Sequence, residues 1–99
     1  MRLFLDDERP TPEGWKRAYT AKDCIFNLQH TYVEELSLDH DLGAEENGTG
    51  YDVVLWIEEQ VFTNPFYNPP KQIYVHSSNS SARQKMLAGI ERINRQLNI

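Results

Sequence analysis

The chain has 99 residues and a formal net charge of −5, which is the length of one domain and leaves no room for a second functional module. The negative charge argues against extended contact with duplex nucleic acid, because such binding depends on many Lys and Arg contacts with phosphates. It leaves a mononucleotide or an RNA end open as a ligand. No apolar run approaches the roughly 20 residues that cross a bilayer, and acids begin at Asp6 without a signal-peptide core. We therefore expect a soluble, cytoplasmic protein that does not bind membranes.

The first part of the chain predicts two strands and a helix. Residues 2–5 form a short apolar strand, and two prolines and a glycine make a full helix unfavourable over 8–14. Residues 15–19 alternate as an edge strand does. Thr20, with Asp23 three residues later, resembles a capping box that opens a helix. The buried positions of this helix follow a 3.6-residue period and are Ala21, Cys24, Ile25 and Leu28.

The middle of the chain predicts a third strand and a second helix. The strand spans residues 36–38, and a polar loop with several glycines, residues 43–50, follows it in a place where it can close over a ligand. Thr49 and Asp52 repeat the capping pattern and open a helix over about 51–62. The apolar face of this helix carries Val54, Ile57 and Val61.

The last part of the chain predicts a fourth strand and a third helix. Residues 64–70 contain three prolines, which end the preceding helix, and residues 72–75 form the strand. Phe66 and Tyr67 either tuck this loop onto the core or offer a stacking surface for a base. After Asn79 a long helix begins, and no fifth strand can be placed. The apolar stripe of this helix is Met86, Leu87, Ile90, Ile93 and Leu97, where the helix ends.

Polar residues follow three of the predicted strands. The segments are 6–9, 39–41 and 76–79, and they contain acids, histidines and an amide. Strands that alternate with helices imply a parallel sheet with helices on both faces. Because the carboxyl ends of parallel strands lie at one edge of a sheet, these groups are expected to converge on a single crevice.

Four aspartates at these strand ends are candidate metal ligands. Close together they repel one another, and a bound cation removes the conflict. A hard ion such as magnesium prefers carboxylate and water oxygens, whereas a histidine ligand shifts the preference toward manganese, zinc or iron. The alternative is that the aspartates only cap turns and helix starts. The four candidates are Asp6, Asp7, Asp39 and Asp41.

Histidines and phosphate-binding groups complete the predicted crevice. His40 and His76 end apolar runs and are suited to move protons near neutral pH, although His76 alternatively only hydrogen-bonds a neighbouring loop. The start of the last helix offers unpaired backbone N–H groups to an anion, or is simply capped by one serine. The arginine after the first acidic pair either clamps a phosphate or neutralises an adjacent acid. The candidate phosphate ligands are Arg9, Ser77, Asn79 and Arg83.

At these motifs the chain resembles the cyclic-phosphate processing receiver-like domains, a divergent branch of the response-regulator receiver fold. The resemblance implies a small flavodoxin-like, three-layer α/β fold over residues 1–99, as a single domain. It further implies a mainly parallel four-stranded sheet in which the first helix and the fifth strand are degenerate or absent. The motifs that carry the resemblance are residues 5–10, 38–43, 49–52 and 76–79, followed by Arg83 and Met86.

The resemblance also implies an acidic, metal-binding pocket whose added histidines and asparagine process cyclic phosphate ends of nucleotides or RNA. The magnesium and phosphoacceptor site of ordinary receivers would fall on Asp6, Asp7 and Asp39. A lysine at the end of a fifth strand normally completes that site, and none can be placed here. Residues 80–82 also depart from the proline and glycine that are expected in relatives.

The leading hypothesis is a metal-dependent phosphoesterase that hydrolyses a cyclic phosphate. The four aspartates would hold magnesium or manganese, which polarises the phosphoryl oxygens. The catalytic residues would be His40, His76 and Asp39, with one histidine acting on water and the other on the leaving ribose oxygen. One rival is a receiver-type signalling domain that accepts a phosphoryl group on Asp39. A second rival is a non-catalytic module that binds a nucleotide or a partner protein.

Overall fold

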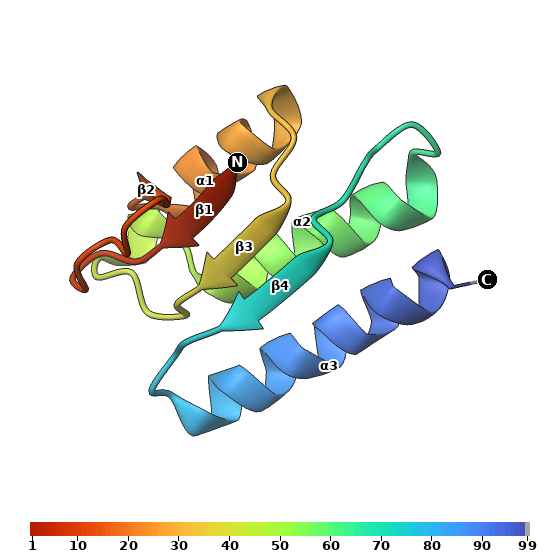
Figure 1. Ribbon diagram of the computed structural model, residues 1–99. Coiled ribbons are helices and arrows are strands. Elements are labelled where there is room, and N and C mark those ends of the chain that lie inside the picture. The colour runs from red at the N-terminus through yellow and green to blue at the C-terminus, as the bar shows by residue number, and fades with distance from the viewer. Residues whose placement is uncertain (99) are drawn as a thin grey trace.

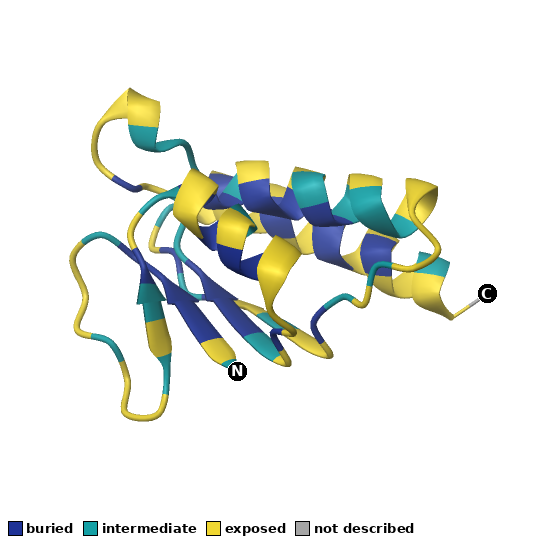
Figure 2. Cartoon of the chain, turned by 90° about the horizontal axis from the view of Figure 1, so that it is seen from above, coloured by how far each residue is buried: buried dark blue, intermediate teal, exposed yellow. Residues whose placement is uncertain are grey.

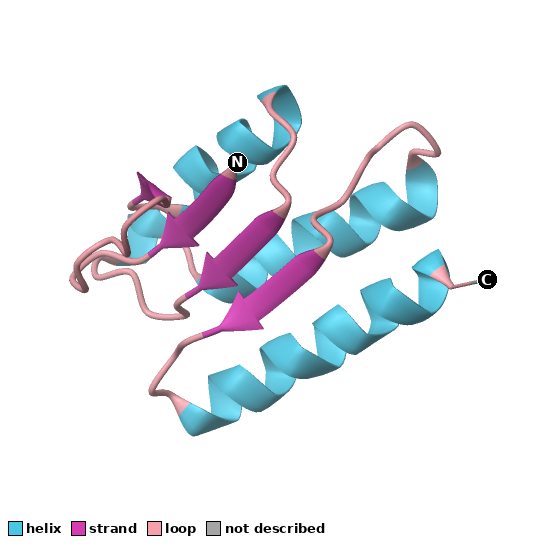
Figure 3. Cartoon of the chain, viewed as in Figure 1, coloured by secondary structure: helices cyan, strands magenta, loops and turns pink. Residues whose placement is uncertain are grey.

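The computed structural model describes residues 1–98, and Ile99, the last residue of the predicted domain, lies outside them. Four strands form one parallel sheet in the order β2-β1-β3-β4, with three α-helices packed on it (Figure 1, Figure 3). The predicted class, a small receiver-like α/β fold with a four-stranded parallel sheet, is confirmed. In chain order the elements are β1 (Arg2–Leu5), β2 (Lys16–Ala18), α1 (Ala21–His30), β3 (Glu35–Leu38), the 3₁₀-helix η1 (Glu45–Asn47), α2 (Gly50–Thr63), β4 (Gln72–Val75) and α3 (Ser80–Leu97).

Side-chain caps set the starts of all three α-helices. The hydroxyl of Thr20 accepts a hydrogen bond from the backbone of Asp23 at 3.1 Å, which starts α1. Thr49 and Asp52 form the reciprocal capping box that the sequence predicts for α2. Asn79, rather than a serine, caps α3 through a hydrogen bond from the backbone N–H of Ala82. Each cap satisfies an N–H group that has no partner inside its helix. No helix of the described residues is both long and apolar enough to cross a membrane.

The hydrophobic core lies between the helices and one face of the sheet. Every second strand residue points to this face, and the leucines of β1 and β3 are fully buried there. Figure 2 shows the buried faces of the helices turned toward the strands. The predicted stripe of α1 is confirmed at Ala21, Cys24 and Leu28, while α2 buries Val53, Val54 and Ile57 and leaves Val61 half-buried.

The predicted stripe of α3 is only partly right. Met86, Ile90 and Ile93 are buried, but Leu87 and Leu97 are 43% and 47% exposed. At Gly89 a Cβ would come within 2.5 Å of a methyl group of Val54, so α2 and α3 cross closely there. Leu87 lies on a neighbouring side of α3, and Leu97 is the last residue of the helix.

The second face of the sheet carries no helix within residues 1–98, so the expectation of helices on both faces is wrong. Figures 1 and 2 show α1, α2 and α3 on one side of the strands. The segment between β1 and β2 runs in the direction that would place a helix on the second face, but its prolines keep it a loop. Arg2 and Glu35 form an ion pair on this face, and Tyr74 donates a hydrogen bond to Glu35.

Replacing Gly50 by alanine tests how closely the start of α2 packs beneath the strand ends. A Cβ at this position would lie 1.9 Å from the backbone oxygen of Asp39. Helix propensity alone predicts that Gly50→Ala raises the free energy of unfolding by about 1 kcal/mol. We expect this steric overlap to dominate and to lower the free energy of unfolding by about 1–3 kcal/mol, because a backbone oxygen, unlike a side chain, cannot rotate out of the way.

Urea unfolding measures this change, and Gly89→Ala is the comparison variant. Its Cβ meets a methyl group of Val54 that can rotate, so it is expected to cost less than Gly50→Ala. A Gly50→Ala protein as stable as the parent would contradict the packing described here.

Candidate functional site

Backbone pairing continues one residue past the ends of the strands. The N–H of Asp6 donates to Ala18, that of Asp39 to Leu5 and that of His76 to Leu38, at 3.1, 2.9 and 3.0 Å. The residues after β1, β3 and β4 are thereby fixed side by side on the same edge of the sheet. The predicted convergence of the three strand-end motifs is present in the structure.

Three carboxylates form a compact cluster at this edge. Asp6, Asp7 and Asp39 each place one oxygen within 4.8 Å of the other two. They lie in a cleft of about 320 Å³, whose wall also includes Arg9 and Asp41. Asp41 is in the cleft but outside the compact cluster. Its carboxylate points instead to His40 and Asn79, at 2.9 and 3.5 Å.

Asp6 is the most restrained of these acids. It is 1% exposed; Oδ1 accepts hydrogen bonds from the backbone of Glu8 and Arg9, and Oδ2 lies 3.0 Å from Nε2 of His76. Burial is the largest single influence on its pKa and raises it, but the hydrogen bonds from Glu8, Arg9 and His76 together outweigh burial. The pKa of Asp6 therefore lies below its ordinary value, and the side chain is an anion at neutral pH.

Asp39 has the opposite electrostatic environment. Burial is the main cause that raises its pKa, and the negative charge of Asp6 adds to this effect. A hydrogen bond from the backbone of His40 and the nearby His76 and Arg9 oppose them only in part. The charged form of Asp39 is therefore less favourable than that of a free aspartate, and a cation shared with Asp6 would offset this.

The residues present fit a hard divalent cation. All three clustered ligands are carboxylate oxygens, the donor type that magnesium and manganese take. Gly43 faces this cluster with a φ of 86°, and a Cβ there would come within 3.2 Å of Oδ2 of Asp7. Glycine thus allows both the backbone turn and the space for the Asp7 carboxylate.

His76 braces Asp6 from the uncovered face of the sheet. Its ring stacks on Phe4, with centroids 4.4 Å apart and planes 3° apart, and Nδ1 lies 2.7 Å from the hydroxyl of Ser37. Because anionic Asp6 can only accept, Nε2 of neutral His76 carries the proton and the hydroxyl of Ser37 donates to Nδ1. Both ring nitrogens are therefore engaged, and the neutral ring holds the Asp6 carboxylate in place.

His40 lies on the other side of Asp41. Its Nδ1 contacts Asp41 at 2.9 Å, and its ring lines a second cavity of about 260 Å³ together with Asn79 and Lys85. Asp41 lines the acidic cleft, and through its contacts with His40 and Asn79 it connects this cleft to the cavity that those two residues line. The two candidate histidines do not face each other across the acidic cleft.

The predicted phosphate ligands lie in different places. Arg9 lines the acidic cleft and donates to the backbone oxygen of His76. The guanidinium of Arg83 donates to the backbone oxygen of Val75. Ser77 is buried, and its hydroxyl accepts from the backbone of Asn79. Ser78, which the sequence analysis did not select, lines the cleft instead.

Ser37 is the functional contact that sequence reasoning missed. It lies between two leucines in β3, so it reads as the interior of an apolar strand. The available signal was the two-residue period of strands, which places Phe4 and Ser37 on the face that also carries Asp6, Asp39 and His76.

Comparison with known proteins found one family. The model described as "Cyclic-phosphate processing Receiver domain" matches residues 1–92. No curated protein and no solved structure matches the chain.

The pKa of His76 tests the bracing contact. Burial is the main cause that holds this pKa below the ordinary 6.5, while the hydrogen bond and charge of Asp6 oppose it. We therefore expect Asp6→Asn to lower the pKa of His76 further, as measured by NMR titration of the ring nitrogens. Because the unfolded chain binds this proton more strongly, acidification below about pH 6.5 should destabilise the fold.

Asp41→Asn is the matched control for this titration. Asp41 contacts His40 and is not among the groups that influence His76, so the pKa of His76 should not change. An unchanged pKa of His76 in Asp6→Asn would show that the two side chains are not in contact.

Proposed function

We propose that this chain, which belongs to the family of cyclic-phosphate processing receiver domains, is a metal-dependent phosphoesterase that hydrolyses a cyclic phosphate of a nucleotide or an RNA end. The family associates the chain with cyclic-phosphate processing as a receiver-like domain. The observation that carries the finer proposal is the carboxylate cluster in a cleft that an arginine also lines. Acids for a cation and a guanidinium for a phosphate are the two charges that such a substrate needs in one place.

Asp6, Asp7 and Asp39 would hold the metal, with magnesium or manganese favoured by the all-oxygen ligands. A bound divalent cation supplies Lewis-acid polarisation of the phosphoryl oxygens and lowers the pKa of a bound water. Asp41 is assigned to a different role, because its carboxylate pairs with His40 and Asn79.

The phosphate would lie beside Arg9 and Ser78. Arg9 is exposed, and one of its nitrogens is fixed by the backbone oxygen of His76, which leaves further N–H groups of the guanidinium for a phosphate. Ser78 also lines the cleft and would add a hydroxyl. Arg83 is not assigned to the phosphate, because its guanidinium is engaged with Val75.

His40 is the best candidate to transfer protons. Hydrolysis adds water to phosphorus and breaks one ring P–O bond, so one proton leaves the water and one reaches the released ribose oxygen. Asp41 holds Nδ1 of His40, which leaves Nε2 to exchange a proton with a substrate that extends from the acidic cleft past Asp41 toward the cavity that His40 lines. In His76 both nitrogens are engaged by Asp6 and Ser37, so His76 is assigned to positioning Asp6 rather than to proton transfer.

Turnover of cyclic phosphates tests the proposal. We expect the protein with magnesium or manganese to convert at least one nucleoside 2′,3′-cyclic phosphate in a panel, as followed by phosphorus NMR. Asp39→Asn removes a cluster carboxylate and should lower the rate at least a hundredfold, since an enzyme that depends on the cation loses about 2.7 kcal/mol or more of transition-state stabilisation. Glu45→Gln, an exposed acid in η1, is the charge-matched control and should keep full activity.

Two results would contradict the proposal. If no cyclic phosphate in the panel is hydrolysed with any of the metals, the protein is not a phosphoesterase of this kind. A stable phosphoryl adduct on Asp39 after incubation with a small phosphodonor, without turnover of any cyclic phosphate, would instead support a receiver-type phosphoacceptor.

A further inference from the structure

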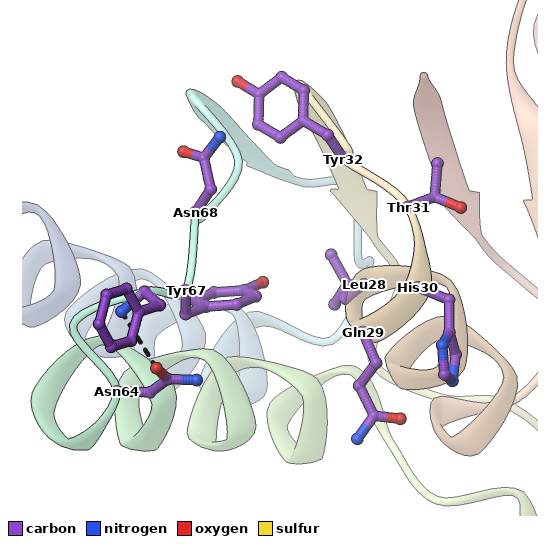
Figure 4. Close-up of a pocket in the computed structure, with 9 residues that line it drawn as sticks. Leu28, Gln29, His30, Thr31, Tyr32, Asn64, Tyr67 and Asn68 are labelled. Atoms are coloured by element: carbon purple, nitrogen blue, oxygen red, sulfur yellow. Dashed lines mark hydrogen bonds between the residues drawn. The ribbon is translucent and has the colours of Figure 1, made fainter.

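A third cavity lies at the opposite end of the strands from the acidic cleft. It has a volume of about 340 Å³ and lies between the end of α1 and the loop after α2 (Figure 4). The segments that line it, residues 28–32 and 64–68, lead into β3 and β4. It is therefore at the amino ends of the strands, whereas the carboxylate cluster is at their carboxyl ends.

The lining of this cavity is polar and aromatic, without acidic or basic side chains other than one histidine. Three of its nine residues are aromatic rings, three are carboxamides, and none is Asp, Glu, Lys or Arg. A phosphate or an ammonium group would find no opposite charge here. The rings are Tyr32, Phe66 and Tyr67, and the carboxamides are Gln29, Asn64 and Asn68.

One helix end contributes to the cavity. Helix α1 ends at His30, and its last three residues line the cavity, where the last carbonyl groups of a helix lack partners inside it. The carboxyl end of a helix also carries partial negative charge. The cavity thus disfavours an anion and favours a neutral ligand that donates N–H groups.

The loop that carries Phe66 and Tyr67 is held in place without a ligand. Asn64 fixes the loop, because its side chain accepts from the backbone of Phe66 at 3.0 Å and its backbone oxygen accepts from Tyr67 at 3.1 Å. The ring of Tyr67 packs edge-to-face on Trp56 at 5.3 Å. Phe66 is 92% exposed, so its large apolar ring is in contact with solvent. Prolines restrict the backbone of the loop that carries it.

Tyr67 also offers an unpaired donor. Its hydroxyl points toward Leu28 at the side of the cavity (Figure 4), and this buried oxygen has no hydrogen-bond partner within residues 1–98. An unmade hydrogen bond of this kind is costly; because the oxygen is buried, a ligand acceptor reaches it only when the side chain of Tyr67 turns toward the cavity.

We propose that this cavity binds an uncharged nucleobase that carries an exocyclic amine, with adenine as the reference case. The base stacks on Phe66 and Tyr67, and its amine donates to the carboxamides and helix carbonyls at the rim. Asn and Gln side chains pair with the donor and acceptor on the adenine edge, and stacking on aromatic side chains tolerates any flat base. This site is separate from the acidic cleft, and the proposal does not depend on the proposed phosphoesterase activity.

Titration with adenosine tests the site by NMR of the backbone amides and by Trp56 fluorescence. We expect saturable shifts confined to residues 28–32 and 64–68. Phe66→Ala should weaken binding five- to hundredfold, as the loss of one stacking partner implies. Phe62→Ala is the matched control, because Phe62 is also exposed but lies outside the cavity, and it should leave the affinity unchanged.

Titrations with related compounds test which part of the ligand is recognised. Adenosine 5′-monophosphate should bind at residues 28–32 and 64–68 no more tightly than adenosine, because the cavity offers no cation to the phosphate. Equal shifts with ribose alone, shifts confined to residues 6–9 and 39–41, or an unchanged affinity in Phe66→Ala would each overturn the proposal. These readouts need no turnover, so they stand or fall apart from the phosphoesterase.

Discussion

The parallel backbone ladder at the end of β1, β3 and β4 is the constraint on which the rest of the site depends. Leu5, Leu38 and Val75 are in register, and pairing continues through the next residue of each strand. Two carboxylates and an imidazole are therefore adjacent because of backbone hydrogen bonds, whatever their side chains prefer. Burial, together with the repulsion from Asp6 that the fold imposes, raises the pKa of Asp39 above its ordinary value. Such imposed repulsion is typical of a site that a cation completes.

The uncovered face of the sheet gives His76 its role. With no helix on that side within the described residues, the imidazole can lie flat on Phe4 and reach across β3 to Asp6. Ser37 completes the arrangement by fixing the second nitrogen. Stacking on Phe4 leaves the side chain of His76 only 17% exposed to solvent. This burial favours the neutral form of the imidazole. The missing helix and the bracing histidine are thus two aspects of one arrangement.

Local sequence signals predicted the elements well, because caps and apolar periods are short-range. The Thr49 and Asp52 box and the apolar runs before Asp6, Asp39 and His76 are examples, and parallel topology then implied the convergence of the strand ends. The orientation of Asp41 toward His40 and the contact of Arg83 with Val75 depend on packing between distant segments, so no local pattern encodes them. The uncovered face did leave a signal: β4 alternates between polar and apolar residues, as one-sided strands do. The cavity beside Phe66 is made by two turns that only the fold brings together.

Paramagnetic broadening by Mn²⁺ tests most directly whether the strand ends form a cation site. If they do, trace Mn²⁺ should broaden the backbone amide signals of residues 6–9 and 39–43 first, leave residues 28–32 and 64–68 sharp, and lose this effect when excess Mg²⁺ is added. Asp39→Asn should abolish the selective broadening. Broadening that is spread over the acidic surface, or that persists unchanged in Asp39→Asn, would contradict a metal site at the carboxyl ends of the strands.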